Sequence, residues 1–385
     1  MHRTFDEVNE KIKSGEAVVM TAEEFIALTK EKGVKAATVE VDVVTCATFG
    51  PMCSSGAFLN FGHSDPPMRM AEIWLNDVQA YGGLAAVDTY IGATQPSETQ
   101  GMEYGGAHVI QDLIDGKKVR LRARSYGTAC YPRREIDTYI TLDDLNQAYL
   151  YNPRNAYQNY AAATNSTDTP IYTYMGILLP KMSNVTYSTS GELSPLLKDP
   201  DLRTIGVGTR IFLGGAIGYV AWEGTQCTLN RAEADDGVEW RAGATIAVVG
   251  NLREMNTRYI RAAVYEKYGI SMFVGIGMAM PVLDEELAKQ LAKGNDRLYT
   301  KVFDYGVPSR SRPDFGWFNY AQLRSGSIEI NGNRIPTAPL SSLKIAREIA
   351  EKLRDMIIKG EFLLTEPVAK LPMEGKFKPL EIRGD

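Results

Sequence analysis

The 385-residue sequence has few of the residues that usually build metal or disulfide sites, with only four cysteines and three histidines. No two cysteines form a Cys-x-x-Cys pair, which structural zinc and iron–sulfur sites normally contain. A Rossmann glycine fingerprint and a Walker-A Lys-Ser/Thr are also missing, so the glycines at 206–218 are attributed to tight turns and close packing. We therefore expect no metal and no tightly bound cofactor, although a site that joins His63 to Cys53 stays open.

Long apolar runs and a strong net charge are missing as well. No apolar segment reaches the roughly 18 residues that a membrane-spanning helix needs, and residues 1–20 are too polar for a signal peptide. The formal charge of −5 offers no electrostatic basis for binding nucleic acid or acidic membranes. A hydrophobic content of 44% is ordinary for a globular protein. We expect a cytoplasmic protein that binds neither nucleic acid nor membrane.

Helix starts and hydrophobic periods predict several elements. Thr4 with Glu7, and Thr21 with Glu24, have the spacing of capping boxes and predict two N-terminal helices. The apolar period from 343 to 357 predicts an amphipathic helix near the C-terminus. Further helices are predicted over 70–80, 108–113, 141–152, 254–268 and 283–292, and strands over 43–45, 118–125, 210–213, 219–222, 244–249 and 271–274.

The alternation of strands and helices after residue 206 predicts the fold class. Such spacing favours parallel strand pairing with helices packed on the sheet. We expect an α/β protein with mixed sheets and packed helices, in a sheet order that the sequence does not reveal. The chain is expected to form one catalytic unit over 1–385, with a lobe boundary near 190–205 and an extended tail over 361–385.

The least ordinary stretch is Asp42–Pro67, which reads DVVTCATFGPMCSSGAFLNFGHSDPP. After a short apolar strand it has no helical or strand period, so packing alone does not explain it. Small residues around Cys53, among them Ser54 and Ser55, let a backbone approach a ligand closely, and sites are often built on loops at strand ends. The alternative is a turn-rich connector with a structural cysteine. We predict that Ser54 and Ser55 contact substrate.

A second cysteine occupies a similar position in the sequence Ser125–Arg134, SYGTACYPRR, which directly follows a predicted strand. Arginines flank Cys130, and a guanidinium that faced the sulfur would lower its pKa and favour the reactive thiolate. Arg133 and Arg134 are equally suited to hold a substrate carboxylate by paired hydrogen bonds, or they form a solvated strand edge. The residues alone thus indicate an enzyme with two thiols.

Two of the three histidines lie beside glycines and are candidates for proton transfer. His63 is the stronger candidate and His108 the weaker, while a structural role is the alternative for each. Cys46 and Cys227 are assigned no role.

The two cysteine motifs, together with GGAHVIQDLIDG and GIGMAMPVLDEELAK, resemble the homocysteine-biosynthesis family of archaea and anaerobic bacteria, the L-aspartate semialdehyde sulfurtransferases. The resemblance covers essentially the whole chain. It implies synthesis of L-homocysteine from L-aspartate semialdehyde and a sulfide equivalent. It also implies an important pair of cysteines, which match Cys53 and Cys130, with Cys130 as the stronger candidate for a persulfide carrier.

The resemblance also implies partners. Two electrons are expected from a reduced ferredoxin-type protein, because this chain has no cysteine-rich segment of its own that would hold an iron–sulfur cluster. A homo-oligomer is expected. In this scheme Cys53 resolves the sulfur as a disulfide, Arg133 or Arg134 holds the substrate carboxylate, and His63 supplies a proton. A sulfur-relay protein that never acts on the aldehyde, or a binding module with structural thiols, would fit the same cysteines.

Overall fold

The computed structural model describes residues 2–155, 161–225, 231–233, 239–241, 245–372, 378 and 380–383. Within these residues the chain forms eight α-helices: α1 Phe5–Ser14, α2 Ala22–Lys32, α3 Val34–Glu40, α4 Gly106–Ile114, α5 Pro195–Lys198, α6 Glu285–Leu291, α7 Tyr320–Arg324 and α8 Leu343–Ile358. None of these helices combines the length and apolar character needed to cross a membrane. Together with the sheets below, they confirm the predicted α/β class.

The N-terminal helices begin where the sequence predicts them to begin. Thr4 Oγ1 accepts the Glu7 N–H at 3.2 Å, and the Glu7 carboxylate accepts the Thr4 N–H at 2.7 Å. Thr21 and Glu24 repeat this exchange at the start of α2. Each capping box satisfies two backbone donors that the first turn of a helix would otherwise leave without a partner.

A large mixed sheet dominates the fold. In the described residues it contains sixteen strands: β1 Val19–Thr21, β2 Val43–Pro51, β3 Gly56–Asn60, β4 Glu72–Leu75, β5 Val78–Tyr81, β6 Asp88–Gly92, β7 Pro96–Ser97, β8 Gly101–Gly105, β9 Val119–Arg124, β10 Glu135–Ile140, β11 Gln147–Asn155, β17 Arg210–Leu213, β18 Ala216–Glu223, β21 Ile246–Asn251, β22 Ile260–Tyr265 and β23 Gly269–Pro281. Its main path runs β1-β2-β23-β17-β18-β21-β11-β3-β6-β5-β4-β9-β10.

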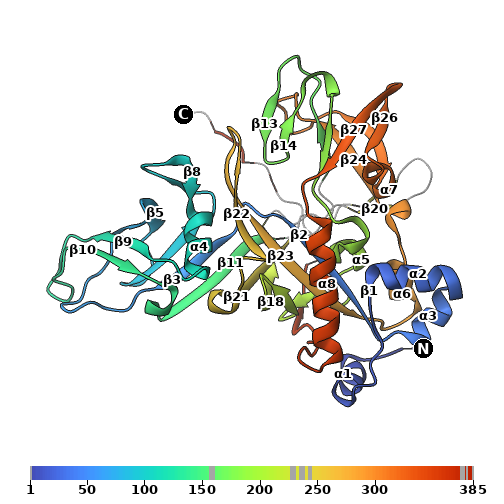
Figure 1. Cartoon of the computed structure of the whole chain (residues 1–385), viewed down its shortest axis with the longest axis horizontal. Helices are drawn as coiled ribbons and strands as arrows, with labels where there is room; N and C mark the ends of the chain where they lie inside the picture. The colour runs from blue at the N-terminus through green and yellow to red at the C-terminus, as the bar shows by residue number, and fades with distance from the viewer. Residues whose placement is uncertain are drawn as a thin grey trace.

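Part of this sheet curls back on itself. Five strands lie between β2 and β3 on the sheet path, yet only the four residues 52–55 connect them in the chain. Such a connection spans at most about 17 Å, so the strands between β2 and β3 bend into a nearly closed barrel. Strands β6 to β10 extend outward from this barrel and lie at one end of the long axis, on the left of Figure 1.

A second sheet of six strands has the order β25-β24-β12-β15-β27-β26. Its strands are β12 Ala162–Thr164, β15 Val185–Tyr187, β24 Tyr299–Asp304, β25 Asp314–Asn319, β26 Ser327–Ile330 and β27 Asn333–Pro339. Three short pairs complete the described strands: β13 Ile171–Thr173 with β14 Gly176–Leu178, β16 Gly206–Val207 with β28 Ala369–Lys370, and β19 Arg231–Glu233 with β20 Glu239–Arg241.

Helix α8 covers the barrel strands β2 and β23, as Figure 1 shows. Its apolar face packs with α1 and with aromatic side chains such as Phe49 and Phe212 in one buried cluster. The segment 190–205, where the sequence suggested a lobe boundary, carries α5, which packs on β2. The tail at 369–370 pairs with β16 in an extended conformation.

Two predicted helices are wrong. Residues 70–80 form the hairpin β4–β5, in which Asn76 and Asp77 both have positive φ, at 48° and 60°. Asn and Asp tolerate this conformation, and a two-residue turn of this kind joins adjacent antiparallel strands. Residues 260–265 form β22, which pairs along its whole length with β23. In both places the sheet pairing outweighs local helix preference.

A third predicted helix, over 141–152, is a single 3₁₀ turn at Leu142–Asp144 followed by strand β11. Pro153 is accommodated in this strand because the pairing with β21 is irregular between Asn152 and Asn155. These strands also explain why the predicted parallel pairing is wrong for most of the sheet. Hairpins produce antiparallel neighbours, and the described parallel ladders are β1–β2, β12–β24 and β15–β27.

Candidate active site around Cys53 and Cys130

Cys53 lies in the tight turn between β2 and β3. Its Sγ is 3.1 Å from the hydroxyl oxygen of Ser271, a fully buried residue on β23. The neighbouring Met52 N–H donates to the Met272 carbonyl at 2.7 Å, which ties the turn to the same strand. Cys53 is held in a defined position and yet is partly exposed as a residue.

The serines beside Cys53 form a hydrogen-bond network with Asn152 on β11. The Ser54 hydroxyl donates to Asn152 Oδ1 at 2.8 Å, and Asn152 Nδ2 donates to Ser55 Oγ at 2.9 Å. The Ser55 hydroxyl in turn donates to the Met52 carbonyl at 2.8 Å. Asn152 and Ser55 are buried, so this network holds the turn in place, and contact of the two serines with substrate stays a prediction.

Close packing explains the glycine at the start of β3. A Cβ atom on Gly56 would lie 2.2 Å from the Tyr90 hydroxyl and 2.6 Å from the Ile91 carbonyl oxygen. No larger residue fits against β6 at this point without displacing it. The glycine therefore lets the strand that carries the Cys53 turn lie directly against its neighbour.

The hairpin β22–β23 forms another wall of the Cys53 site. Tyr265 on β22 has a buried hydroxyl, and Tyr268 in the hairpin turn packs edge-on against its ring at 6.3 Å between centroids. Burial raises the pKa of Tyr265, and the charge that Cys53 carries when ionised raises it further. Tyr265 is thus a neutral phenol within the electrostatic reach of the Cys53 sulfur.

Cys130 lies at the tip of a different turn, between β9 and β10. Thr128 and Tyr131 bond to each other through their backbones, at 2.9 and 3.2 Å, so that Ala129 and Cys130 are the two exposed residues of a tight loop. Gly127 has φ = +74°, and a Cβ there would lie 2.9 Å from Arg134 Nε. Among the described residues Cys130 is exposed, whereas Cys53 is only partly exposed.

His63 and Arg133 lie at the base of the Cys130 turn. The His63 ring stacks on Tyr131 with centroids 5.8 Å apart. Arg133 Nε donates to the Pro66 carbonyl at 3.1 Å, and one of its terminal nitrogens donates to the Asp65 carbonyl. The guanidinium therefore clamps the turn to the loop after β3, while Arg134 is exposed. The predicted roles of these residues toward substrate stay predictions.

The strand register shows that the two thiols are far apart. Phe58 on β3 is paired with Tyr90 on β6, Tyr90 with Tyr81 on β5, Tyr81 with Glu72 on β4, and Glu72 with Arg124 on β9. Four strand spacings of about 4.8 Å separate the ends of this row, which makes a path of about 19 Å along the sheet. The two cysteines therefore belong to strands that are four places apart.

The positions along the strands increase this separation. Cys53 precedes β3, on the Gly56 side of the row, whereas the Cys130 turn leaves β9 on the opposite side, near the loop after Asn60. A disulfide needs Cα atoms within about 7 Å. The structure thus places Cys53 with the two serines, and Cys130 with His63 and the two arginines, in two separate groups.

The remaining cysteines and His108 are outside both groups. Cys46 is fully buried, and burial raises the pKa of its thiol to about 12, which makes it unreactive. Cys227 lies outside the described residues. His108 Nδ1 accepts the Gly105 N–H at 3.1 Å at the start of α4, which is a structural role. In the described part of the chain, no three His, Cys, Asp or Glu residues are placed to hold a metal ion.

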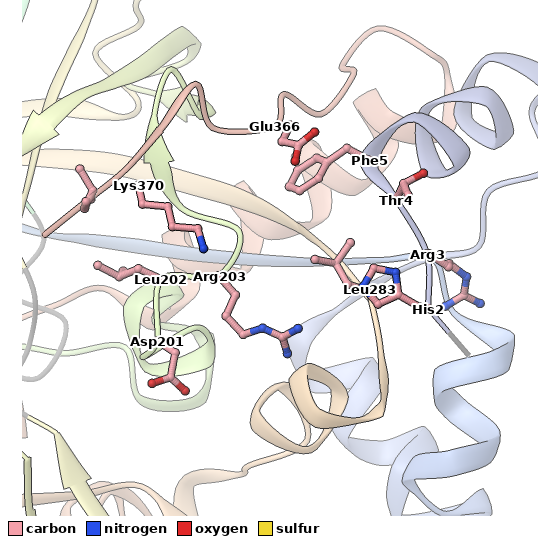
Figure 2. A pocket seen from close by; sticks show the side chains of 11 residues that line it. His2, Arg3, Thr4, Phe5, Asp201, Leu202, Arg203, Leu283, Glu366 and Lys370 are labelled. Atoms are coloured by element: carbon pink, nitrogen blue, oxygen red, sulfur yellow. The ribbon is translucent and has the colours of Figure 1, made fainter. Parts of the chain in front are cut away.

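A pocket of about 450 Å³ lies elsewhere, between the N-terminus, the loop at 201–203 and the tail at 366–371. Figure 2 shows that basic side chains line it. Two of them are already paired, because Arg203 bonds the Asp284 carboxylate at 2.6 and 3.0 Å and Arg3 lies 3.3 Å from Asp42. We therefore attribute this pocket to the packing of the chain ends and not to the thiol chemistry.

Sequence reasoning missed Asn152, Tyr265 and Ser271. Asn152 and Tyr265 have no cysteine or glycine-rich segment nearby, whereas Ser271 lies two residues after Gly269 on β23. All three come to the Cys53 site only through sheet pairing. The NPRN segment at 152–155 was the one available signal, because a polar residue before a proline in a buried strand is unusual.

Comparison with known proteins identifies the family. A family model described as "Homocysteine biosynthesis enzyme, sulfur-incorporation" matches residues 17–364. A relative from Methanosarcina acetivorans, named L-aspartate semialdehyde sulfurtransferase, is 50% identical over 381 residues, which cover 99% of this chain and 74% of the relative. One of the same name from Methanocaldococcus jannaschii is 53% identical over 384 residues, 96% of this chain and 73% of the relative.

An uncharacterised protein from Methanothermobacter thermautotrophicus is 30% identical over 322 residues, 81% of this chain and 70% of that protein. No solved structure matches the chain. The match over residues 17–364, and the two relatives that match nearly the whole of this chain, confirm the family that the cysteine motifs indicated. The chain belongs to the family of homocysteine biosynthesis enzymes that incorporate sulfur.

Proposed function

We propose that the protein is a sulfurtransferase that makes L-homocysteine from L-aspartate semialdehyde and a sulfide equivalent, with two electrons from a reduced ferredoxin-type protein. The names of two relatives that are 50% and 53% identical support the substrate. The observation that carries the proposal is the Cys53 site, where an accessible thiol sits in a turn held by Ser271 and Asn152. A fixed and accessible thiol is what nucleophilic sulfur chemistry requires.

In the proposed cycle, hydrosulfide attacks Cys130 Sγ of a Cys53–Cys130 disulfide, the S–S bond breaks, and Cys53 leaves as a thiolate. The outer sulfur of the Cys130 persulfide then adds to the aldehyde carbon, and the aldehyde oxygen takes up a proton. Cys53 attacks Cys130 Sγ, which restores the disulfide and releases a thiohemiacetal. Loss of water and addition of two electrons and two protons then give the thiol of homocysteine.

The residues around each thiol receive roles in this proposal. His63, which stacks on Tyr131 at the base of the Cys130 turn, supplies the proton to the substrate oxygen. Arg134 is exposed at the same turn and binds the substrate carboxylate, and Arg133, which is bonded to the 65–66 loop, assists it. Ser54 and Ser55 orient the substrate beside Cys53.

The separation of the two thiols within one chain is a reason to expect a homo-oligomer. Sulfur exchange requires contact between Cys53 and Cys130, and within one chain the register places them four strands apart and at opposite ends of those strands. We propose that the enzyme works as a homo-oligomer in which the exposed Cys130 turn of one copy reaches the Cys53 site of another. The protruding position of β9 and β10 supports this arrangement (Figure 1).

The test is anaerobic peptide mass spectrometry on wild type, Cys53→Ser and Cys130→Ser after incubation with sulfide. The cycle starts from the oxidised protein, so each sample is first oxidised under conditions that form protein disulfides without attaching a reagent to lone thiols. A gain of one sulfur, about 32 Da, is expected on the Cys130 peptide of the wild type and not of either variant. L-aspartate semialdehyde with reductant should remove it as homocysteine appears. Sulfur that stays on Cys130 in the presence of aldehyde would instead identify a sulfur-relay protein.

A further inference from the structure

One buried polar atom beside Cys53 has no partner. The hydroxyl oxygen of Tyr265 is buried, and no hydrogen bond from another described residue satisfies it. Buried polar groups are hydrogen-bonded in the great majority of cases, because burial without a partner costs free energy. A phenylalanine would fill the same space without this cost, so the presence of the hydroxyl calls for a function.

The ladder between β22 and β23 places this hydroxyl on the Cys53 side. Ala263 is directly opposite Ser271, and Tyr265 lies two residues further along β22. Residues two apart on a strand share a face, so the Tyr265 side chain leaves the sheet on the same face as Ser271 and diagonally next to it. Ser271 is the residue whose hydroxyl touches Cys53 Sγ at 3.1 Å.

We propose that Tyr265 is a positioning residue for the Cys53 thiolate, to whose sulfur its hydroxyl donates a hydrogen bond once Cys53 is ionised. This inference rests on the proposed function only in taking Cys53 as a reactive thiol. A donor that has no partner beside a neutral thiol gains a strong one when the sulfur becomes an anion, since hydrogen bonds to charged groups are the stronger kind. Tyr265 would thereby favour the thiolate, which is the nucleophile in sulfur exchange.

The surroundings suit this role. The raised pKa of Tyr265 keeps the phenol protonated at neutral pH, as a donor must be. Charged and titratable groups of the same hairpin include Glu266, Lys267 and Tyr268, and Lys267 Nζ donates to the Tyr172 hydroxyl at 3.3 Å. On β11, Arg154 Nε donates to Thr225 Oγ1 at 2.9 Å. Ser271 supplies a second hydroxyl to the sulfur from the opposite strand. The Ser271 hydroxyl thus touches the sulfur, and Tyr265 leaves the same face of the hairpin diagonally next to Ser271.

The experiment measures the rate at which iodoacetamide alkylates Cys53 as a function of pH, peptide by peptide, in the reduced wild-type protein and in Tyr265→Phe. We expect the apparent pKa of Cys53 to rise by about one unit in the variant, because a hydrogen bond to the thiolate is lost. At pH values below both pKa values, Cys53 should then react about tenfold more slowly. Cys130 in the same samples is the internal control and should be unchanged.

Two comparisons separate this role from a structural one. Tyr81→Phe removes a hydroxyl from an exposed tyrosine on β5 and should leave the Cys53 profile unchanged. The Tm of Tyr265→Phe should stay within about 2 °C of wild type, because the lost hydroxyl had no partner. An unchanged Cys53 profile, or a shift accompanied by a lower Tm, overturns the proposal. Alkylation needs neither aldehyde nor electron donor, so a failure here is distinct from a failure of the proposed reaction.

Discussion

The two cysteine turns look alike in sequence and differ in structure. Each follows a strand and consists of small residues around one cysteine, yet the Cys53 turn is bonded to β11 and β23, whereas the Cys130 turn is an exposed hairpin tip. An enclosed thiol is suited to orienting a substrate, and an exposed one to meeting a second protein molecule. The comparison teaches that a shared motif does not imply a shared site.

The largest effect on activity is expected from replacing each of the two cysteines in turn. Cys53→Ser and Cys130→Ser should each lower homocysteine formation at least about 10³-fold, since each removes a sulfur that takes part in the chemistry. If the two turns meet between copies, mixing the two variants under conditions that exchange subunits should restore activity. For a dimer the restored activity reaches about a quarter of wild type, because half of the dimers are mixed and each has one intact site.

Mixed variants that demonstrably exchange subunits and remain inactive would contradict transfer between copies. An independent readout is oxidative cross-linking, which should yield a disulfide-linked dimer from wild type and none from either variant.

The next largest effect is expected from Gly56→Ala at the start of β3. The added Cβ would meet the Tyr90 hydroxyl at 2.2 Å, so we expect the free energy of unfolding in urea to fall by about 2–4 kcal/mol. Gly92→Ala is the matched control, because Gly92 is the ladder partner of Gly56 and its Cβ would meet nothing within 4 Å. Equal effects of the two substitutions would show that close packing does not determine the Cys53 turn.

A smaller effect is expected from Asn152→Ala. Asn152 is buried and bonds both serines of the Cys53 turn, so its removal should lower the free energy of unfolding by about 2 kcal/mol and alter Cys53 alkylation. Asn146→Ala, at an exposed position just before β11, loses one side-chain bond to Asn60 and should change the free energy of unfolding by less than about 0.5 kcal/mol. Unaltered Cys53 alkylation in Asn152→Ala would mean that this network does not position the thiol.

The smallest effect is expected from Arg133→Ala, and it should be confined to the Cys130 turn. Loss of the bonds to the 65–66 carbonyls should cost about 1 kcal/mol locally, which speeds hydrogen exchange of the Thr128 and Tyr131 amides about fivefold. Cys53 alkylation should not change. Arg134→Ala is the comparison, and faster exchange there but not in Arg133→Ala would reverse the assignment of the clamp.

Local signals in the sequence determined several elements correctly. The capping boxes at Thr4 and Thr21, the apolar period of α8 and the alternation in β9 depend on residues within one or two turns of each other. The cysteine motifs likewise identified the family, because a long and unusual run of residues is specific by itself. The hairpin β4–β5 was predictable in principle from its Asn-Asp turn.

Tertiary structure alone decided the rest. Residues 260–265 form a strand because β23 offers a full ladder of partners, and this outweighs their helix preference. Ser271, Asn152 and Tyr265 reach Cys53 from strands far away in the chain, and the order of the strands between β3 and β9 separates Cys53 from Cys130. Local sequence determines what a segment prefers, but which segments lie side by side depends on pairing and burial summed over the whole sheet.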